Sequence, residues 1–101
     1  MKMYTAYRTP AFDKLCGTLD KHEQQWISKT INKLEDNPLG KILRYDWFRE
    51  KKYTSKRLFF IIDELSKRIL LIAFAHKKEQ QTIINKVIAN KEELFRYIRS
   101  L

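Results

Sequence analysis

Glycine, proline and cysteine are scarce in this chain, and each scarcity excludes a class of structure. Two Gly and two Pro among 101 residues leave little room for flexible linkers, which argues against a disordered protein. The single cysteine, Cys16, excludes an internal disulfide and fits a reducing compartment, and its apolar neighbours predict that it is buried. The sequence also lacks Cys-x-x-Cys and His-x-x-x-His spacings and any glycine-rich phosphate loop, so we expect no metal and no cofactor.

Long hydrophobic runs are missing as well. The most apolar stretch, 69–75, has only the length of a strand, against the roughly 20 residues that cross a bilayer as a helix. No stretch resembles a signal peptide. We therefore expect a cytoplasmic protein with no membrane partner.

Apolar residues and positive charge are abundant. A 44% hydrophobic content over 101 residues predicts one packed domain, 1–101. Lysine and arginine number 21 against 12 acidic residues, which leaves a net charge of +9. This excess does not bear on the fold, but it attracts nucleic acid, anionic membranes or acidic protein segments.

The first third of the chain predicts a strand followed by a helix. The segment 3–8 is rich in Tyr and Thr and has the length of a short strand. Thr9 then supplies a helix-capping hydroxyl, and Pro10 suits the first helical position because its missing N–H is not needed there. Gly17 follows the apolar residues of this helix, and we expect it to end the helix in a left-handed conformation.

A second helix follows directly. Asp20 with Glu23 three residues later is typical of a capping box at a helix start. An apolar stripe of period 3.6 then continues until the helix-stopping segment 37–40; its members are Trp26, Ile27, Thr30, Ile31 and Leu34. The two helices are predicted to form a hairpin that needs a sheet to cover its apolar side.

The chain changes character after residue 42. Segments 46–53, 57–63 and 68–76 are rich in aromatic and branched residues, and turns are plausible at 53–56 and 63–67. Short connections of this kind predict an antiparallel meander. The third segment is apolar at nearly every position, so we expect it to be covered on both faces.

Helical periodicity returns from residue 77 to the end, with a second helix start indicated by Asn90 and Glu93. Whether 77–101 forms one helix or two is left open. The predicted fold class is α+β, in the order β-α-α-β-β-β-α. It comprises a small, mostly antiparallel sheet of about four strands, an N-terminal helical hairpin and a C-terminal helix.

Positive charge is concentrated between residues 41 and 57, together with aromatic rings. Seven cationic side chains face only two acidic ones there: Lys41, Arg44, Arg49, Lys51, Lys52, Lys56 and Arg57 against Asp46 and Glu50. The two-residue period of a strand places Arg49 and Lys51 on one face and Glu50 with Lys52 on the other. Such a surface can hold phosphates by charge and bases by stacking. The alternative is a solvated face over core aromatics.

A second basic cluster, His76-Lys77-Lys78, lies where the last strand turns into the final helix. Cations at a helix N-terminus are mildly unfavourable, by roughly 0.3–1 kcal/mol each, which indicates another use for Lys77 and Lys78. His76 is either a proton-transfer group or an ordinary residue at a strand end.

The chain resembles the RelE/ParE superfamily of toxin–antitoxin toxins, especially archaeal-type RelE-like members. The resemblance covers most of the chain and rests on the element order and four short pieces of sequence: Asn-Pro-Leu-Gly-Lys at 37–41, Arg-Glu-Lys-Lys at 49–52, Lys-Arg-Leu-Phe-Phe at 56–60 and His-Lys-Lys-Glu-Gln-Gln at 76–81. It implies a small sheet with a helical hairpin packed on it and a concave basic surface.

The resemblance also implies a function. RelE-type toxins cut mRNA in the ribosomal A site without metal, and an antitoxin, which we expect to be small and acidic, binds and silences them in a hetero-oligomer. By position, Arg57 matches an arginine that contacts substrate phosphate, Lys52 a basic position on the preceding strand, and Lys78 an arginine after the last strand. The candidate catalytic set is therefore Arg57, Lys52, Lys78 and His76, and the candidate RNA-binding set is Arg44, Arg49, Lys51, Lys56 and Lys77.

One position departs from the RelE pattern. The resemblance calls for a catalytic tyrosine early in the final helix, where this chain has Ile84, and no tyrosine occurs between Tyr53 and Tyr97. The general base is then His76, a lysine with a depressed pKa, or no residue at all. The leading hypothesis is a ribosome-dependent mRNA endonuclease. The alternatives are a ParE-like or other non-cleaving toxin that binds a protein target, and a plain RNA-binding domain.

Overall fold

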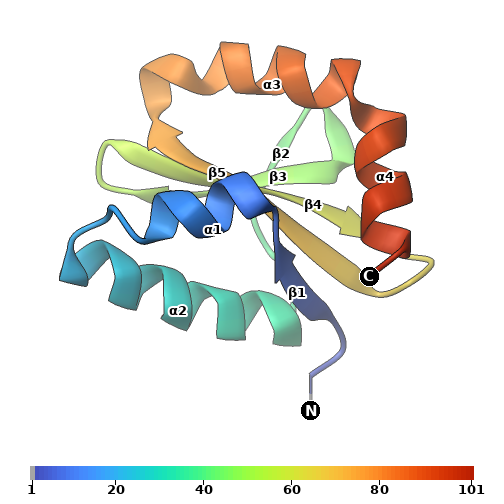
Figure 1. Cartoon of the computed structure of the whole chain (residues 1–101), viewed down its shortest axis with the longest axis horizontal. Helices are drawn as coiled ribbons and strands as arrows, with labels where there is room; N and C mark the ends of the chain where they lie inside the picture. The colour runs from blue at the N-terminus through green and yellow to red at the C-terminus, as the bar shows by residue number, and fades with distance from the viewer. Residues whose placement is uncertain (1) are drawn as a thin grey trace.

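The computed structural model describes residues 2–101, which form one mixed sheet with two helices on each face (Figure 1). The strands are β1 (Thr5–Arg8), β2 (Lys41–Leu43), β3 (Tyr45–Tyr53), β4 (Lys56–Asp63) and β5 (Arg68–His76). Their order across the sheet is β1-β5-β4-β3-β2, and every neighbouring pair is antiparallel except β1 and β5, which are parallel.

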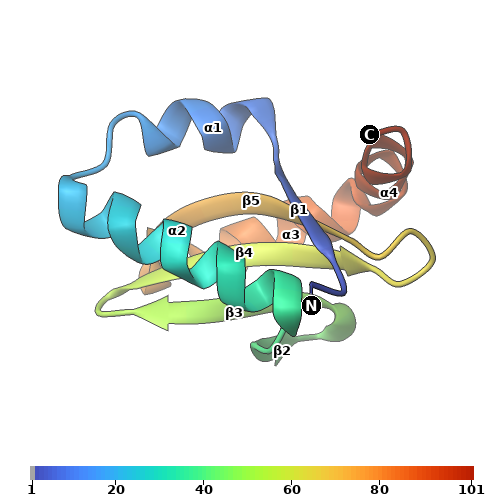
Figure 2. The ribbon, with the colours of Figure 1, turned by 90° about the horizontal axis from the view of Figure 1, so that it is seen from below.

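The helices lie on opposite sides of this sheet. Helices α1 (Pro10–Cys16) and α2 (Lys21–Asp36) cover one face, and α3 (Gln80–Ala89) and α4 (Lys91–Arg99) cover the other, with the short 3-10 turn η1 (Lys77–Glu79) leading into α3. In Figure 2, α2 lies in front of the sheet and α3 behind it. No described helix is both long enough and apolar enough to cross a membrane.

The predicted helix starts are confirmed. The Thr9 hydroxyl accepts a hydrogen bond from the Phe12 N–H at 3.0 Å, and Pro10 is the first residue of α1. At α2, the Glu23 N–H donates to the Asp20 carboxylate at 2.8 Å, and the Asp20 N–H donates back to Glu23 at 3.3 Å. Both caps satisfy backbone donors that have no partner inside the helix.

The expectation that Gly17 is left-handed is wrong. Gly17 has a φ of −66° and a ψ of −17°, which is right-handed helical backbone. A left-handed residue is not needed there because other groups cap the last carbonyls of α1. The Gln24 side chain donates to the Cys16 carbonyl at 2.8 Å, and the Thr18 hydroxyl donates to the Leu15 carbonyl at 2.7 Å.

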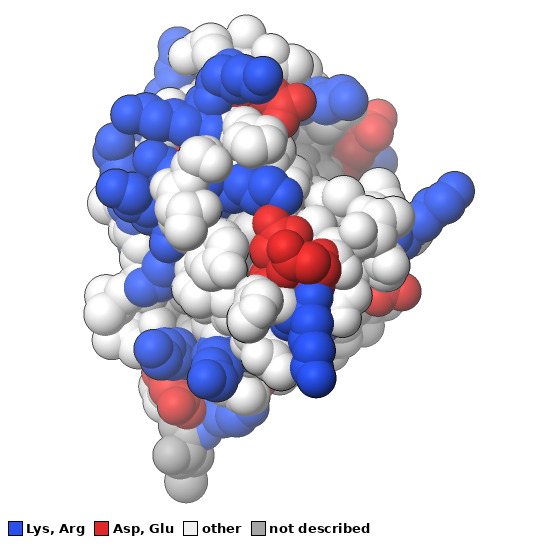
Figure 3. Space-filling view, turned by 90° about the vertical axis from the view of Figure 1, so that its left-hand side faces the viewer, with Lys and Arg blue, Asp and Glu red and all other residues white. Residues whose placement is uncertain are grey.

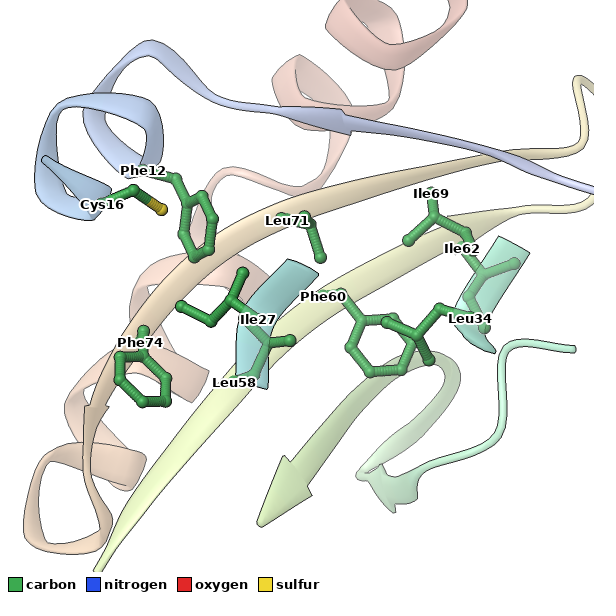
Figure 4. Close-up of a cluster of buried hydrophobic side chains, with 10 residues drawn as sticks. All are labelled: Phe12, Cys16, Ile27, Leu34, Leu58, Phe60, Ile62, Ile69, Leu71 and Phe74. Carbon is green, nitrogen blue, oxygen red and sulfur yellow. The ribbon is translucent and has the colours of Figure 1, made fainter. Parts of the chain in front are cut away.

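Two hydrophobic clusters hold the layers together, one on each side of the sheet. Residues of β4 alternate between them: Leu58 and Phe60 point toward α1 and α2, while Phe59 and Ile61 point toward α3 and α4. Figure 4 shows the first cluster, in which side chains of β4 and β5 meet those of the two N-terminal helices. Full burial of one such side chain stabilises a fold by about 1.5–3 kcal/mol.

Strand β5 is covered on both faces, as its continuous apolar pattern predicted. Ile69 and Leu71 belong to the cluster under α1 and α2, and Leu70 belongs to the cluster under α3 and α4. Cys16 is buried in the first cluster, and burial raises the pKa of its thiol. The question left open for residues 77–101 is answered by two helices, since α3 ends at Ala89 and α4 begins at Lys91.

The sheet has five strands rather than about four. The additional strand, β2, pairs antiparallel with β3 through Lys41 opposite Glu50 and Ile42 opposite Arg49. A strand of three residues is too short to show a two-residue period, so the sequence alone did not predict it.

Candidate nucleic-acid interface

The β3–β4 hairpin places its basic side chains in register. Lys52 of β3 lies directly opposite Arg57 of β4, and Glu50 lies opposite Phe59. Directly opposed residues point to the same face of a sheet. Since Phe59 packs beneath α3 and α4, this face also carries Glu50, Lys52 and Arg57.

Two other segments close around this part of the hairpin. Gly40 and Lys41 approach from β2, and the backbone contact is so close that a Cβ on Gly40 would lie 2.9 Å from the Glu50 carbonyl oxygen. Lys77 approaches from η1, where its N–H donates to the Ser55 carbonyl in the β3–β4 turn at 3.0 Å.

These segments surround a hollow of about 320 Å³, which we call the basic hollow. Its lining residues are Gly40, Lys41, Glu50, Lys51, Lys52, Arg57 and Lys77. Five of these lining residues are cationic and only one, Glu50, is acidic. Figure 3 views the molecule from the side of the β3–β4 turn and shows Lys and Arg gathered toward the upper left of this face. A concentration of one charge in a concave site raises the local concentration of polyanions.

Arg57 is the most firmly held cation of the basic hollow. Its side chain is only 10% exposed, and its Nε lies 3.1 Å from Oε2 of Glu50. Its Nη1 donates to the Lys56 carbonyl at 2.9 Å and to the Thr54 carbonyl at 3.2 Å. None of the described residues accepts from Nη2, and no buried polar side-chain atom among them lacks a partner, so Nη2 reaches solvent. The guanidinium is therefore fixed on two sides and open on the third.

Glu50 is in turn held by α3. Its side chain is 4% exposed, and its second oxygen accepts from the Gln80 amide at the start of that helix. The pair is buried and both carboxylate oxygens of Glu50 have a partner, which favours toleration of a buried ion pair. Glu50 thereby helps to hold the Arg57 guanidinium in the lining of the basic hollow.

Two predicted RNA-binding residues lie on the opposite face of the sheet. Arg49 donates from Nε to the Asp46 carbonyl and from Nη1 to the Pro38 carbonyl, each at 2.9 Å. Lys56 is 2.6 Å from the Glu23 carboxylate, and its Nζ lies 5.2 Å from the centre of the Phe74 ring. Both cations have structural partners there, and neither lines the basic hollow.

Three further predicted residues lie outside the basic hollow. His76 is the register partner of Lys56, so it faces the α1 and α2 side, with its Nδ1 3.5 Å from the Ser55 hydroxyl. Lys78 is exposed and follows Lys77, but it is not among the lining residues. Arg44 precedes β3 and so lies at the end of that strand opposite to Lys52. Of the nine predicted site residues, the hollow unites Lys51, Lys52, Arg57 and Lys77.

No tyrosine of the described residues lines the basic hollow. Ile84 is 8% exposed and packs in the core beneath α3. Tyr53 is nearer in sequence, but its ring contacts Trp26 and Phe74 on the other face, with ring centres 4.8 Å and 6.0 Å apart. No tyrosine of the described residues therefore takes the place in the basic hollow of the tyrosine that Ile84 replaces.

The site predicted from the sequence lacked three residues of the basic hollow: Gly40, Lys41 and Glu50. The two-residue period of β3 does group Glu50 with Lys52, and that signal could have identified it. Gly40 and Lys41 reach the site only because β2 pairs with β3, which no local pattern reveals. The described residues contain no cluster of three or more potential metal ligands.

Comparison with known proteins identifies the fold. No family model and no curated protein sequence matches this chain. Among solved structures, a mutant of the E. coli toxin RelE in the free state superposes with a TM-score of 0.69 at 14% identity, over 80% of this chain and 90% of that one. The RelBE2 toxin–antitoxin complex of Mycobacterium tuberculosis matches with a TM-score of 0.64 at 20% identity, over 73% and 98% of the two chains.

The intact E. coli RelBE toxin–antitoxin complex gives a TM-score of 0.65 at 14% identity, over 72% of this chain and 95% of its match. The chain therefore has the fold of RelE toxins, which confirms the predicted α+β class and the structural side of the resemblance. Identities this low bear on fold and not on activity, because one fold hosts many functions.

Proposed function

We propose that this protein is the toxin of a toxin–antitoxin pair and that it cleaves mRNA on the ribosome. The observation that carries the proposal is the basic hollow, where Arg57, Lys52 and Lys77 converge from three separate segments of a RelE fold. A plain solvated face would not require a buried arginine that is held by Glu50 in the lining of a hollow.

The geometry fits metal-independent cleavage of a phosphodiester. Such an enzyme must align the 2′-OH with the scissile phosphate and stabilise the negative charge that develops there. Arg57 offers a fixed, planar donor for a phosphate oxygen, and Lys41, Lys52 and Lys77 add mobile positive charge around it. Because His76 faces the other side of the sheet, a lysine of the basic hollow is the better candidate for the general base.

One observation favours a second candidate function. With Ile84 buried and Tyr53 on the opposite face, the basic hollow lacks the tyrosine that the RelE resemblance implies. A toxin that binds its target without cutting RNA, as a ParE-like protein does, needs no such residue. In that case the basic hollow would hold an acidic surface of a protein target.

An antitoxin partner is part of both proposals. Two of the similar structures are complexes of toxin and antitoxin, and a chain of net charge +9 is well suited to an acidic inhibitor. We propose that a small acidic antitoxin binds this chain in a hetero-oligomer and covers the basic hollow. A toxin directed at ribosomes would act in the cytoplasm.

Toeprinting on translating ribosomes tests the proposed activity. We expect the purified protein to produce cuts in ribosome-bound mRNA, and Lys52→Ala to reduce the rate by about 100-fold, as loss of one charge-stabilising donor typically does. Lys52 is exposed, so its removal should not disturb folding. Lys29→Ala is the matched control, because Lys29 is an exposed lysine on α2.

Each other result identifies a different function. Growth arrest on induced expression with intact mRNA would favour the non-cleaving toxin. Salt-dependent RNA binding without growth arrest would indicate a plain RNA-binding domain. Equal cleavage by the parent and Lys52→Ala would contradict the proposed site.

A further inference from the structure

Three aromatic rings at the start of β3 form a nearly parallel stack. The ring centres of Tyr45 and Trp47 are 5.3 Å apart with 9° between their planes. Trp47 and Phe48 follow at 6.0 Å and 15°. The stack runs from Phe48, which is fully buried, outward to Tyr45, which is 43% exposed.

The inner part of this stack is rigid. Phe48 packs against Phe59 in the core beneath α3 and α4. Trp47 meets the edge of Phe95 of α4 at 5.3 Å and 79°. Tyr45 therefore rests on a fixed ring, and Trp47 is its only ring neighbour among the described residues. An exposed ring that ends a rigid stack can accept another planar group at little entropic cost.

Two cationic residues lie near the same rings. The Lys91 Nζ lies 5.3 Å from the centre of the Trp47 ring. Arg44 is exposed and immediately precedes Tyr45, where it is the single residue between β2 and β3. Its φ of 64° is uncommon for a residue with a side chain, and strain of this kind often accompanies functional positions.

We propose that the outer face of Tyr45 is a stacking subsite for a base of single-stranded RNA, with Arg44 and Lys91 beside the adjoining phosphates. The inference rests on the proposed RNA-directed function and adds a second point of contact to it. Lys52 lies seven residues further along β3, roughly 23 Å at the usual rise of a strand. Tyr45 is thus separate from the basic hollow, and one RNA strand of several nucleotides would be needed to reach both.

RNA fits this surface better than a protein segment does. A base stacks parallel to an aromatic ring, which is the arrangement that Tyr45, Trp47 and Phe48 already adopt. Every nucleotide also carries a phosphate, which complements the cationic residues Arg44 and Lys91.

The test measures, by fluorescence anisotropy, the affinity of the protein for a single-stranded RNA of about 12 nucleotides. This length lies within the usual range of single-strand binding sites. We expect Tyr45→Ala to weaken binding roughly 5- to 100-fold, the effect of losing one stacked base. Tyr45→Phe keeps the ring and should bind like the parent. Met3→Ala removes an exposed apolar side chain beside the other edge of the sheet and controls for nonspecific loss.

Salt dependence separates stacking from charge. Removing a ring releases no counterion, so Tyr45→Ala should leave the slope of log K against log salt unchanged. Lys52→Ala should reduce that slope by about 0.7, the value for one phosphate contact on a single strand. Matching urea midpoints of Tyr45→Ala and Tyr45→Phe would show that the comparison is between folded proteins.

Four outcomes would overturn the inference. If Tyr45→Ala binds RNA as tightly as the parent while Lys52→Ala is weakened, the stack is not an RNA contact, and the proposed function stands. The inference is equally wrong if Tyr45→Phe loses as much affinity as Tyr45→Ala, or if Tyr45→Ala impairs binding only to an acidic protein partner. A parent protein that binds no RNA overturns both the inference and the proposed cleavage.

Discussion

At the scale of single residues, Arg57 shows how one side chain can serve both the fold and the site. Its Nε and Nη1 are bound to Glu50 and to backbone carbonyls, which leaves Nη2 for a ligand. The arrangement depends on the fork of a guanidinium, since a lysine at this position has one nitrogen and cannot hold all of these partners in the same geometry. The buried ion pair also makes the site sensitive to loss of either member.

We predict that Arg57→Ala lowers the free energy of unfolding by about 3 kcal/mol, because it leaves the buried Glu50 carboxylate without its cation. Adding Glu50→Gln removes the uncompensated charge and should recover at least half of that loss. Urea denaturation of the parent, the single variant and the double variant measures both effects. Equal stability of parent and Arg57→Ala would show that Glu50 does not depend on this arginine.

At the scale of elements, the short strand β2 completes the basic hollow. It brings Lys41 opposite Glu50 and has Gly40 just before it. The backbone of Gly40 lies so close to β3 that an added Cβ would meet the Glu50 carbonyl at 2.9 Å and the Phe60 ring at 3.1 Å. Glycine is required at position 40 by this close approach and not by its backbone angles, since its φ is not positive.

The two glycines are therefore predicted to respond in opposite ways to alanine. Gly40→Ala should lower the free energy of unfolding by about 1–3 kcal/mol, the usual cost of overpacking, and should displace Lys41 from the basic hollow. Gly17→Ala should raise it by about 0.4–1 kcal/mol, because Gly17 has right-handed backbone and an added Cβ would be in ordinary contact, 3.5 Å from the Lys14 carbonyl.

Urea unfolding of the two variants side by side measures this difference. If Gly40→Ala left the free energy of unfolding unchanged, β2 would be able to move away from β3 without loss of stability.

At the scale of the whole molecule, two carboxylates fasten the first and last described segments to the body. Glu35 of α2 accepts from Lys2 and from the Ala6 N–H, each at 2.8 Å. Asp63 of β4 accepts two hydrogen bonds from Arg99 of α4, each at 3.1 Å. Burial alone would raise the pKa of both carboxyl groups, but these hydrogen bonds outweigh it and leave each pKa lower than usual.

Acid should therefore loosen both segments. A lowered pKa in the folded state means that the unfolded chain binds more protons, so the stabilisation is complete above the ordinary carboxyl pKa near 4 and is lost as the pH falls through the folded value. We predict that the urea midpoint declines between pH 5 and pH 2, and that Asp63→Asn makes the decline shallower. A decline of unchanged steepness in Asp63→Asn would exclude Asp63 as a source of this dependence.

Local sequence determined most of the elements and the nature of the site. Helix starts at Thr9 and Asp20 and the two-sided burial of β5 follow from short-range patterns, because capping and periodicity are properties of neighbouring residues. Net charge and the cluster at 41–57 likewise indicated a polyanion, and the turn between β3 and β4 was predicted at 53–56.

Tertiary structure alone decided which of the cations act together. Sequence cannot show that Arg49, Lys56 and His76 turn to the face of α1 and α2, that Arg44 lies beside an aromatic stack at the other end of β3, or that β2 carries Lys41 to the site. These facts depend on strand order and register, which are fixed by the packing of the two hydrophobic clusters across the sheet. A one-residue change of register would reverse every side chain of a strand, and no local pattern encodes that choice.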